Sequence, residues 1–248
     1  MTRVSAIIPA RNEAASIGAV VDALLALQRP DGTPWVDEVI VANNDSVDST
    51  REIAQAAGAR VVDVPQHGYG QACWDAIQDA HGDMLLFVDG DGAADPADSP
   101  ALLQALESGL DLAIGTRQFP DAGSMSASQI LGNGLACALI RGIWGVKTTD
   151  LGPHRAIRRD AFDRIAMQDR SFGWTVEMQL RAHLLHMRVA EVPVAWRART
   201  GGVSKISGTL RGVLGAGFGI LGMVFRLWLN EQRRVEPLLA PPASRESV

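Results

Sequence analysis

The chain contains 248 residues, 47% of them hydrophobic, and carries a formal net charge of −5. This length and apolar content suit an enzyme-sized globular protein, and the negative charge argues against a general nucleic-acid-binding protein. Two cysteines, Cys73 and Cys137, are too few and too far apart for a disulfide framework or a zinc site. The apolar run before Arg11 spans only about five residues, too few for a signal peptide or membrane span, so we expect a cytoplasmic protein.

Strand-like and helix-like segments alternate through the first half of the chain. The predicted strands cover residues 4–8, 38–42, 60–64, 84–88 and 111–114, and the predicted helices cover residues 13–27, 48–58, 68–82 and 96–109. This alternation is typical of βαβ units, and it predicts a mostly parallel sheet with helices on both faces. The second half is less regular, with predicted helices over 126–145 and 175–186 and a strand over 188–196.

The stretch LLFVDGDGAADP, residues 85–96, places Asp89 and Asp91 directly after a predicted strand. Asp-Gly is a strong hairpin signal when strands flank it on both sides, so an acidic turn is the simpler interpretation. Residues 97–109 instead carry leucines at helical spacing, which makes the pattern strand, loop, helix. Open α/β sheets bind ligands at the carboxyl ends of such strands. This stretch alone leaves both a turn and a metal site open.

Polar residues also follow three other predicted strands, at 9–13, 43–48 and 115–117. Polar residues after several strands at the same edge of a sheet favour a ligand site there. An Asp-X-Asp pair suits a hard divalent cation, Mg²⁺ or Mn²⁺, shared with the phosphates of a substrate such as a nucleotide diphosphate. The chain has no P-loop, and no GxGxxG between its first strand and helix, which weighs against a nucleoside triphosphatase or a dinucleotide oxidoreductase.

A series of motifs extends along most of the chain. In order, they are IIPARNE, NNDSVDST, GYGQACWDAIQDAHGD, FVDGDG, IGTR, DLGPHRAIRRDAF, GWTVEMQLRA and GGVSKISGT. Together they resemble the family 2 glycosyltransferases of the GT-A fold, in particular the dolichyl-phosphate mannose or glucose synthase-like branch. The resemblance implies a nucleotide-diphospho-sugar transferase fold whose catalytic domain covers residues 1–205. Residues 1–118 would form its nucleotide-sugar-binding half and residues 119–205 its acceptor half.

The resemblance also implies roles for individual residues. Asp89 and Asp91 would hold the divalent metal ion, and a UDP- or GDP-sugar would be the donor. The positions expected to bind that donor are Pro9, Arg11, Asn12, Glu13, Asn43, Asp45, Gly70, Asp89, Gly90, Asp91, Arg199 and Ser204. Arg11 and Glu13 have a simpler alternative, stabilisation of the first helix through its dipole.

Four residues are expected to act in an inverting transfer of the sugar. Asp91, Arg117 and Lys205 would stabilise the departing diphosphate together with the metal. Glu177 is the expected general base for a hydroxyl acceptor, with Asp150 second, whereas a phosphate acceptor needs no base. A plain surface acid is the alternative interpretation of Glu177.

Two positions depart from the family pattern. Asn43 and Asn44 stand where the family often has an aspartate pair, so recognition of the base is expected to differ. Ala93 stands where the mannose synthase branch often has a glutamine near the metal. These departures leave a catalytically silent nucleotide-sugar-binding module as one alternative.

Residues 206–230 predict an apolar, amphipathic helix, and residues 231–248 a flexible tail. Arg211 and Arg226 enclose 14 uncharged residues, too few for a confident membrane span but suitable for a helix in the membrane interface. The helix and the basic segment 197–211 favour a polyprenyl phosphate acceptor at the inner face of the cytoplasmic membrane. A soluble acceptor, a helix packed on the protein's own core, and a homodimer through this helix remain alternatives.

Overall fold

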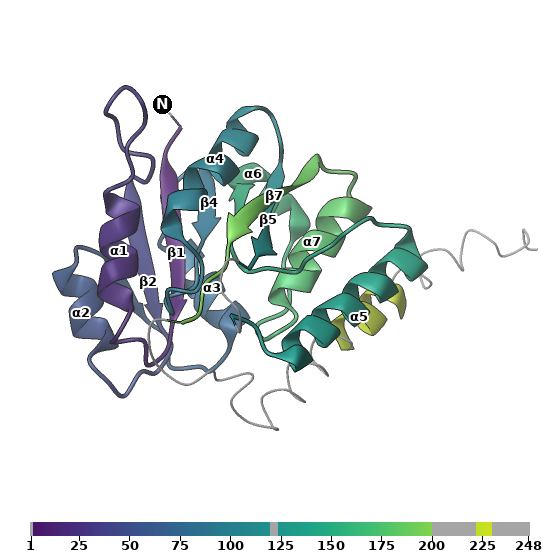
Figure 1. Ribbon diagram of the computed structural model, residues 1–248, viewed down its shortest axis with the longest axis horizontal. Coiled ribbons are helices and arrows are strands. Elements are labelled where there is room, and N and C mark those ends of the chain that lie inside the picture. Colours follow the sequence, from purple (N-terminus) through teal and green to yellow (C-terminus); the bar gives the residue numbers. More distant parts are fainter. Residues whose placement is uncertain (1, 120–123, 200–221, 230–248) are drawn as a thin grey trace, which may run out of the picture.

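The structure is a computed structural model that describes residues 2–119, 124–199 and 222–229. A seven-stranded sheet forms its centre (Figure 1), in the order β3-β2-β1-β4-β6-β5-β7. The strands are β1 (Val4–Ala10), β2 (Glu38–Asn43), β3 (Arg60–Asp63), β4 (Met84–Phe87), β5 (Leu112–Gln118), β6 (Arg155–Arg158) and β7 (Val189–Ala195). The helices are α1 (Ile17–Leu25), α2 (Thr50–Ala56), α3 (Tyr69–Gln78), α4 (Ser99–Glu107), α5 (Ala127–Trp144), α6 (Arg159–Ile165) and α7 (Trp174–Leu184), with a 3₁₀ turn, η1, at Pro96–Asp98.

The sheet is parallel except for β6. β1 pairs in parallel with β2 and β4, and β5 pairs in parallel with β7. β6 lies antiparallel between β4 and β5. The predicted mostly parallel sheet is therefore confirmed, but β6 is a strand that the sequence pattern did not indicate. Arginines occupy both its ends, Arg155 and Arg158, so its apolar signal is only two residues long.

Alternating side chains of the strands supply two separate apolar layers. Val4, Ala6 and Ile8 of β1 lie in one layer with α1, α2 and α4. Ile7 lies in the other layer, which contains α3, α6 and α7. This period of two is what a strand buried on both faces requires. The prediction of helices on both faces of the sheet is thus confirmed.

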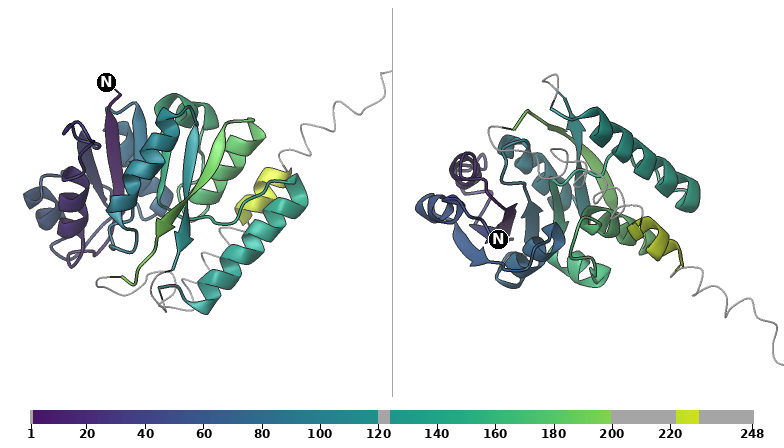
Figure 2. Two further views of the ribbon diagram at one scale, coloured as in Figure 1. Left: turned by 45° about the horizontal axis from the view of Figure 1, so that its top comes forward. Right: turned by 90° about the horizontal axis from the view of Figure 1, so that it is seen from below.

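α5 lies beside this body rather than on the sheet (Figure 2). It begins with a capping box, in which the Gln129 backbone N–H donates to Ser126 Oγ and the Gln129 side chain accepts from the Ser126 N–H. It ends at Gly145, whose φ of 68° is the left-handed conformation favoured after a helix. Its buried residues pack against α7 and against a short helix over residues 222–229.

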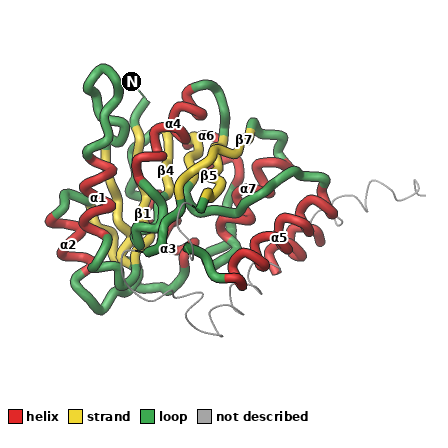
Figure 3. Tube along the Cα trace, in the orientation of Figure 1, coloured by secondary structure: helices red, strands yellow, loops and turns green. Residues whose placement is uncertain are grey.

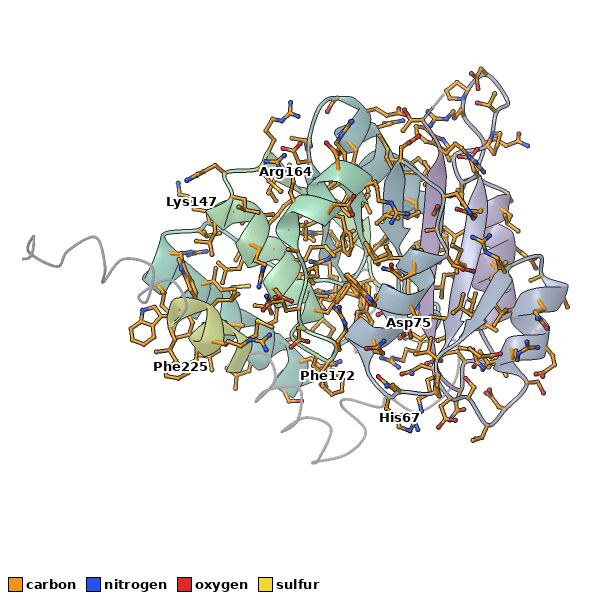
Figure 4. All side chains as sticks on the ribbon, turned by 180° about the vertical axis from the view of Figure 1, so that it is seen from behind. His67, Asp75, Lys147, Arg164, Phe172 and Phe225 are labelled. Carbon is orange, nitrogen blue, oxygen red and sulfur yellow. The ribbon has the colours of Figure 1, made fainter. Side chains whose placement is uncertain are left out.

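The 222–229 helix is the described part of the predicted C-terminal helix. Met223, Val224 and Leu227 are buried against α5 and α7, so this part packs on the protein's own core. Phe225, on its outer side, is 57% exposed (Figure 4). Residues 206–221 and the predicted tail over 231–248 lie outside the described residues. Within the described ranges, no helix is both long and apolar enough to cross a membrane.

Candidate active site

The loops that follow β1, β2 and β4 meet at one edge of the sheet (Figure 3). The Asn12 N–H donates to Ser46 Oγ at 3.0 Å, and Asn12 Oδ1 accepts from the Val47 N–H at 2.8 Å. Ser16 Oγ donates to the Gly90 carbonyl at 2.7 Å. These bonds tie the three loops together, so the predicted gathering of polar loops at this edge is confirmed.

The residues expected around the donor are not equally accessible at this edge. Arg11 and Asp45 are exposed, and Pro9 and Asn12 are half-buried. Glu13 is buried, and its N–H donates to Thr50 Oγ1 at 2.8 Å. Its carbonyl accepts from the Ile17 N–H at 2.9 Å, which places Glu13 at the N-terminus of α1, so stabilisation of the helix through its dipole stays an alternative for this residue.

The two asparagines after β2 have internal partners. Asn44 donates to the carbonyls of Val64 and Gln66 and accepts from the Gly68 N–H at 3.0 Å. Asn43 Nδ2 donates to Asp63 Oδ1 at 2.9 Å, whereas the buried Asn43 Oδ1 has no hydrogen-bond partner. Asn44 therefore holds the neighbouring loop, and Asn43 retains a free acceptor at the site.

Asp89 and Asp91 lie directly after β4, as the sequence predicts. Asp89 Oδ1 accepts a hydrogen bond from the Tyr69 hydroxyl at 3.1 Å. Asp91 is buried, its Oδ1 accepts from the Ala93 N–H at 2.9 Å, and its Oδ2 lies 3.0 Å from Arg199 Nη2. Desolvation and the neighbouring Asp91 carboxylate raise the pKa of Asp89 to about 7. The two carboxylates thus interact across the site, and Arg199 is in contact with one of them.

This pair has the chemistry of a divalent-cation site. The pKa of Asp89 is raised by desolvation and by the charge of Asp91, and a hard cation would stabilise both carboxylates. Nowhere in the described parts of the chain do three His, Cys, Asp or Glu side chains gather in a metal-binding arrangement. A cation held by Asp89 and Asp91 would therefore take further ligands from a substrate phosphate and water, which is the usual arrangement for Mg²⁺.

Close packing accounts for the glycines predicted at the donor site. A Cβ on Gly90 would lie 3.2 Å from Ile17 Cδ1 and 3.3 Å from Ile8 Cγ2. A Cβ on Gly70 would lie 2.8 Å from the Asp169 carbonyl oxygen. Both glycines therefore have a structural reason within the protein, and their contact with a donor stays a prediction.

Arg117 lies within β5 rather than beyond its end, because β5 continues in register with β7 as far as Gln118. Its Nε donates to Asp150 Oδ2 at 2.9 Å, and its Nη2 donates to Asn133 Oδ1 at 3.2 Å. Asp150 also accepts from the Arg117 and Leu151 backbone N–H groups at 2.7 Å each. This engagement makes Asp150 a poor candidate for a general base.

An open pocket of about 270 Å³ lies beside this ion pair. Its lining combines polar groups with apolar side chains from the start of α5 and the segment before it. The lining residues are Thr116, Arg117, Gln118, Phe119, Met125, Ile130, Asn133, Thr149 and Asp150. The pocket can therefore receive a molecule that has both a polar and an apolar part.

The environment of Glu177 fits neither a general base nor a surface acid, the two roles predicted from the sequence. It is 0% exposed, so it is not a surface acid. Its Oε2 accepts from the backbone N–H groups of Gln168 and Asp169 at 3.0 and 2.7 Å, and its Oε1 lies 2.9 Å from Arg181 Nε. A carboxylate held by these partners is unsuited to accept a substrate proton, so the geometry does not support Glu177 as general base.

Two candidate residues, Ser204 and Lys205, lie outside the described residues. Two further residues near the site, Tyr69 and Arg155, were not predicted from the sequence. Tyr69 reaches Asp89 from α3, and Arg155 is fully buried nearby, where burial lowers its pKa to about 10. Arg155 Nη1 donates to the Thr175 carbonyl at 2.8 Å. Tyr69 lies next to Gly70 in the GYG motif, and this position beside a predicted donor-binding residue was the available indication in the sequence.

The mostly parallel sheet, with paired carboxylates at its carboxyl edge, is the architecture that the resemblance to the nucleotide-sugar-dependent transferases of the GT-A fold implies. The family model for glycosyl transferase family 2 matches residues 5–166. The chain therefore belongs to glycosyl transferase family 2, and it is a glycosyltransferase.

Relatives with related sequences support this membership. The uncharacterized glycosyltransferase Rv0539 of Mycobacterium tuberculosis (strain ATCC 25618 / H37Rv) is 34% identical over 210 residues, which is 84% of this chain and 92% of that protein. The undecaprenyl-phosphate mannosyltransferase of Micrococcus luteus is 30% identical over 227 residues, which is 85% of this chain and 90% of that protein.

The fold also matches solved structures. Glucosyl-3-phosphoglycerate synthase from Mycobacterium tuberculosis, in complex with Mn²⁺, UDP-glucose and phosphoglyceric acid, gives a TM-score of 0.72 at 23% identity. The match covers 92% of this chain and 80% of that chain. At this identity the likeness shows the shared fold alone, and it confirms the predicted GT-A architecture.

Proposed function

We propose that this protein transfers a hexose, with inversion, from a UDP- or GDP-sugar to an acceptor, with Mg²⁺ or Mn²⁺ held by Asp89 and Asp91. The observation that carries the proposal is the interacting carboxylate pair at the carboxyl edge of the sheet, with the raised pKa of Asp89. The Mn²⁺ and UDP-glucose bound by the synthase of the same fold support this choice of ligands.

The chemistry centres on the diphosphate that leaves the sugar. A bound divalent cation would supply positive charge to stabilise that leaving group. Arg199 Nη2 lies 3.0 Å from Asp91 Oδ2, so its guanidinium is beside the place where those phosphates would bind. Pro9, Arg11, Asn12, Glu13, Asn43 and Asp45 are proposed to bind the base and ribose, and Ser204 and Lys205 the phosphates. Arg117, which is paired with Asp150, lines the open pocket, so we assign it to the acceptor side.

The proposed acceptor is a polyprenyl phosphate. The Micrococcus luteus relative carries undecaprenyl phosphate in its name. α5 extends from the open pocket and exposes Ile130, Leu131 and Leu135, at 55%, 74% and 51%. The pocket would receive the phosphate, and the apolar face of α5 would lie along the isoprenoid chain at the membrane surface. A phosphate acceptor is already an anion, which agrees with the absence of any support for Glu177 as a base.

A soluble phosphorylated acid is the second candidate acceptor. Glucosyl-3-phosphoglycerate synthase of Mycolicibacterium paratuberculosis is 41% identical over 96 residues, although this covers only 36% of the present chain. The solved synthase of similar fold contains phosphoglyceric acid. This candidate requires no membrane surface.

The test compares transfer by the full chain from radiolabelled UDP- and GDP-hexoses, with Mn²⁺, to undecaprenyl phosphate and to 3-phosphoglycerate. We expect labelled lipid, its loss with EDTA, and at least a roughly 100-fold lower rate in Asp91→Ala. Asp79→Ala, at the far end of α3, is the matched control and should retain the rate. Labelled phosphoglycerate alone would favour the second acceptor. Full activity of Asp91→Ala would exclude the proposed metal site, and nucleotide binding without any transfer would indicate a silent module.

A further inference from the structure

Tyr69, the first residue of α3, contacts a proposed metal ligand directly. Its hydroxyl donates to Asp89 Oδ1 at 3.1 Å, and it is the single tyrosine of the chain. The ring packs against the apolar layer beneath the sheet. A tyrosine hydroxyl is protonated at neutral pH, so it acts as the donor to this carboxylate.

The start of α3, which carries Tyr69, is held by the segment 169–171. The Gly70 and Gln71 N–H groups donate to the carbonyls of Ser171 and Arg170 at 3.2 and 2.8 Å. A Cβ on Gly68 would lie 2.3 Å from the Arg170 carbonyl oxygen, so only glycine permits this approach. The position of the tyrosine is therefore fixed from the backbone side.

The supporting segment is itself anchored from α7. Glu177 Oε2 accepts from the backbone N–H groups of Gln168 and Asp169, and Asp169 Oδ1 accepts from the Ser171 N–H at 2.8 Å. A continuous set of hydrogen bonds thus runs from the buried Glu177 through this segment and α3 to Asp89. Such supports reduce the freedom of a ligating side chain before the metal arrives.

We propose that Tyr69 is a positioning residue for the metal site. Its hydrogen bond fixes the rotation of the Asp89 carboxylate, so that the remaining lone pairs face Asp91 and the bound cation. The inference rests on the proposed function, since it needs a cation at Asp89 and Asp91. In this arrangement the buried Glu177 supports the segment through backbone contacts and does not act as a general base.

The first test measures Mn²⁺ binding to the full chain by electron paramagnetic resonance. In Tyr69→Phe, which removes only the hydroxyl, we expect about tenfold weaker Mn²⁺ binding. The KM for Mn²⁺ in transfer should rise by a similar factor, whereas kcat at saturating Mn²⁺ should change by less than about threefold. Trp74→Phe is the matched control, because Trp74 lies on the same helix and packs against Arg170 and Phe162 without reaching Asp89.

The second test uses the fact that Tyr69 is the single tyrosine. Labelling with 3-fluorotyrosine places one ¹⁹F resonance at this position. Titration with Mg²⁺ should shift that resonance in the otherwise unchanged chain and leave it unmoved in Asp89→Asn. If the chain binds Mn²⁺ but the resonance does not shift on titration with Mg²⁺, the role of Tyr69 is overturned.

The outcomes separate the two proposals. If the unaltered chain binds no Mn²⁺, the metal site fails and the role of Tyr69 fails with it. If it binds Mn²⁺ and Tyr69→Phe binds equally well, only the role of Tyr69 is overturned. Equal weakening in Tyr69→Phe and Trp74→Phe would show that packing of α3, and not the hydroxyl, is responsible, which would also overturn it.

Discussion

Asp89 keeps its proton to a higher pH than an ordinary aspartate does. Its carboxylate is desolvated and faces the Asp91 carboxylate, and the Tyr69 hydroxyl and Arg199 offset this only in part. Because the pKa in the folded chain, about 7, lies above the unfolded value, this group stabilises the fold most at low pH. That contribution is lost as the pH rises through about 7. Ionisation of Asp89 therefore costs free energy in the metal-free site, and a bound cation would offset this cost.

Asp89→Asn should accordingly stabilise the metal-free protein at pH 8. The amide is uncharged and can still accept from Tyr69, so the repulsion from Asp91 is removed. We expect Tm to rise by roughly 2–5 °C at pH 8 and by clearly less at pH 5, where the folded Asp89 is protonated and only the unfolded carboxyl is ionised. Scanning calorimetry in EDTA at both pH values measures this. An equal shift at both pH values would contradict the electrostatic explanation.

At the scale of elements, most of α7 is buried because the helix lies between two apolar layers. Trp174, Met178 and Ala182 contact the layer beneath the sheet, whereas Val176 and Leu180 contact α5 and the 222–229 helix. A helix that is covered on both sides lacks a continuous polar face, so the sequence pattern does not show which of its residues are buried. The acidic residue within it, Glu177, is therefore buried although the sequence pattern suggests a helix with an available acid.

Substitutions of Glu177 should separate a structural role from a catalytic one. Glu177→Ala leaves two backbone N–H groups and Arg181 without their partner, which should cost about 3–5 kcal/mol and lower Tm by about 10 °C. Glu177→Gln keeps one acceptor oxygen and should lose less stability while retaining most of kcat. Chemical denaturation and transfer assays measure the two quantities. A Glu177→Gln variant with an unchanged Tm and a kcat lowered about 1000-fold would instead identify a general base.

At the scale of the molecule, polar and apolar surfaces occupy different elements. The polar loops gather at the carboxyl edge of β1, β2 and β4, while α5 and the 222–229 helix expose Leu131, Leu135 and Phe225. Figures 1 and 2 show these two helices side by side, apart from α1 and α2. A transferase that takes a water-soluble donor and a lipid acceptor would need both kinds of surface.

The double substitution Leu131→Asn and Leu135→Asn should weaken binding to vesicles that contain phosphatidylglycerol. Each buried leucine contributes about 1–2 kcal/mol in an apolar environment, so we expect binding to fall by roughly tenfold or more. Co-sedimentation of the full chain measures this. Val47→Asn is the matched control, because Val47 is 88% exposed but lies on the loop after β2. If the double variant and the control sediment alike, the α5 face is not a membrane surface.

Most strands of the sheet and the position of the carboxylate pair could be predicted from the sequence. Strand periodicity, the strand-loop-helix pattern around Asp89 and Asp91 and the ordered motifs are local signals, and the structure retains the elements that they predict. Local signals missed β6, whose apolar core is two residues long, and placed Gly115–Arg117 beyond a strand that contains them.

The contacts of the individual polar side chains, in contrast, could not be predicted from the sequence. Periodicity tells which residues share a face of a helix, but it does not tell which element covers that face. The partners of Glu177 are backbone groups of Gln168 and Asp169, and those of Asn44 come from the loop after β3. The Tyr69 hydroxyl meets Asp89 only because the segment 169–171 fixes the start of α3. These contacts depend on packing between distant parts of the chain, which no single stretch of sequence encodes.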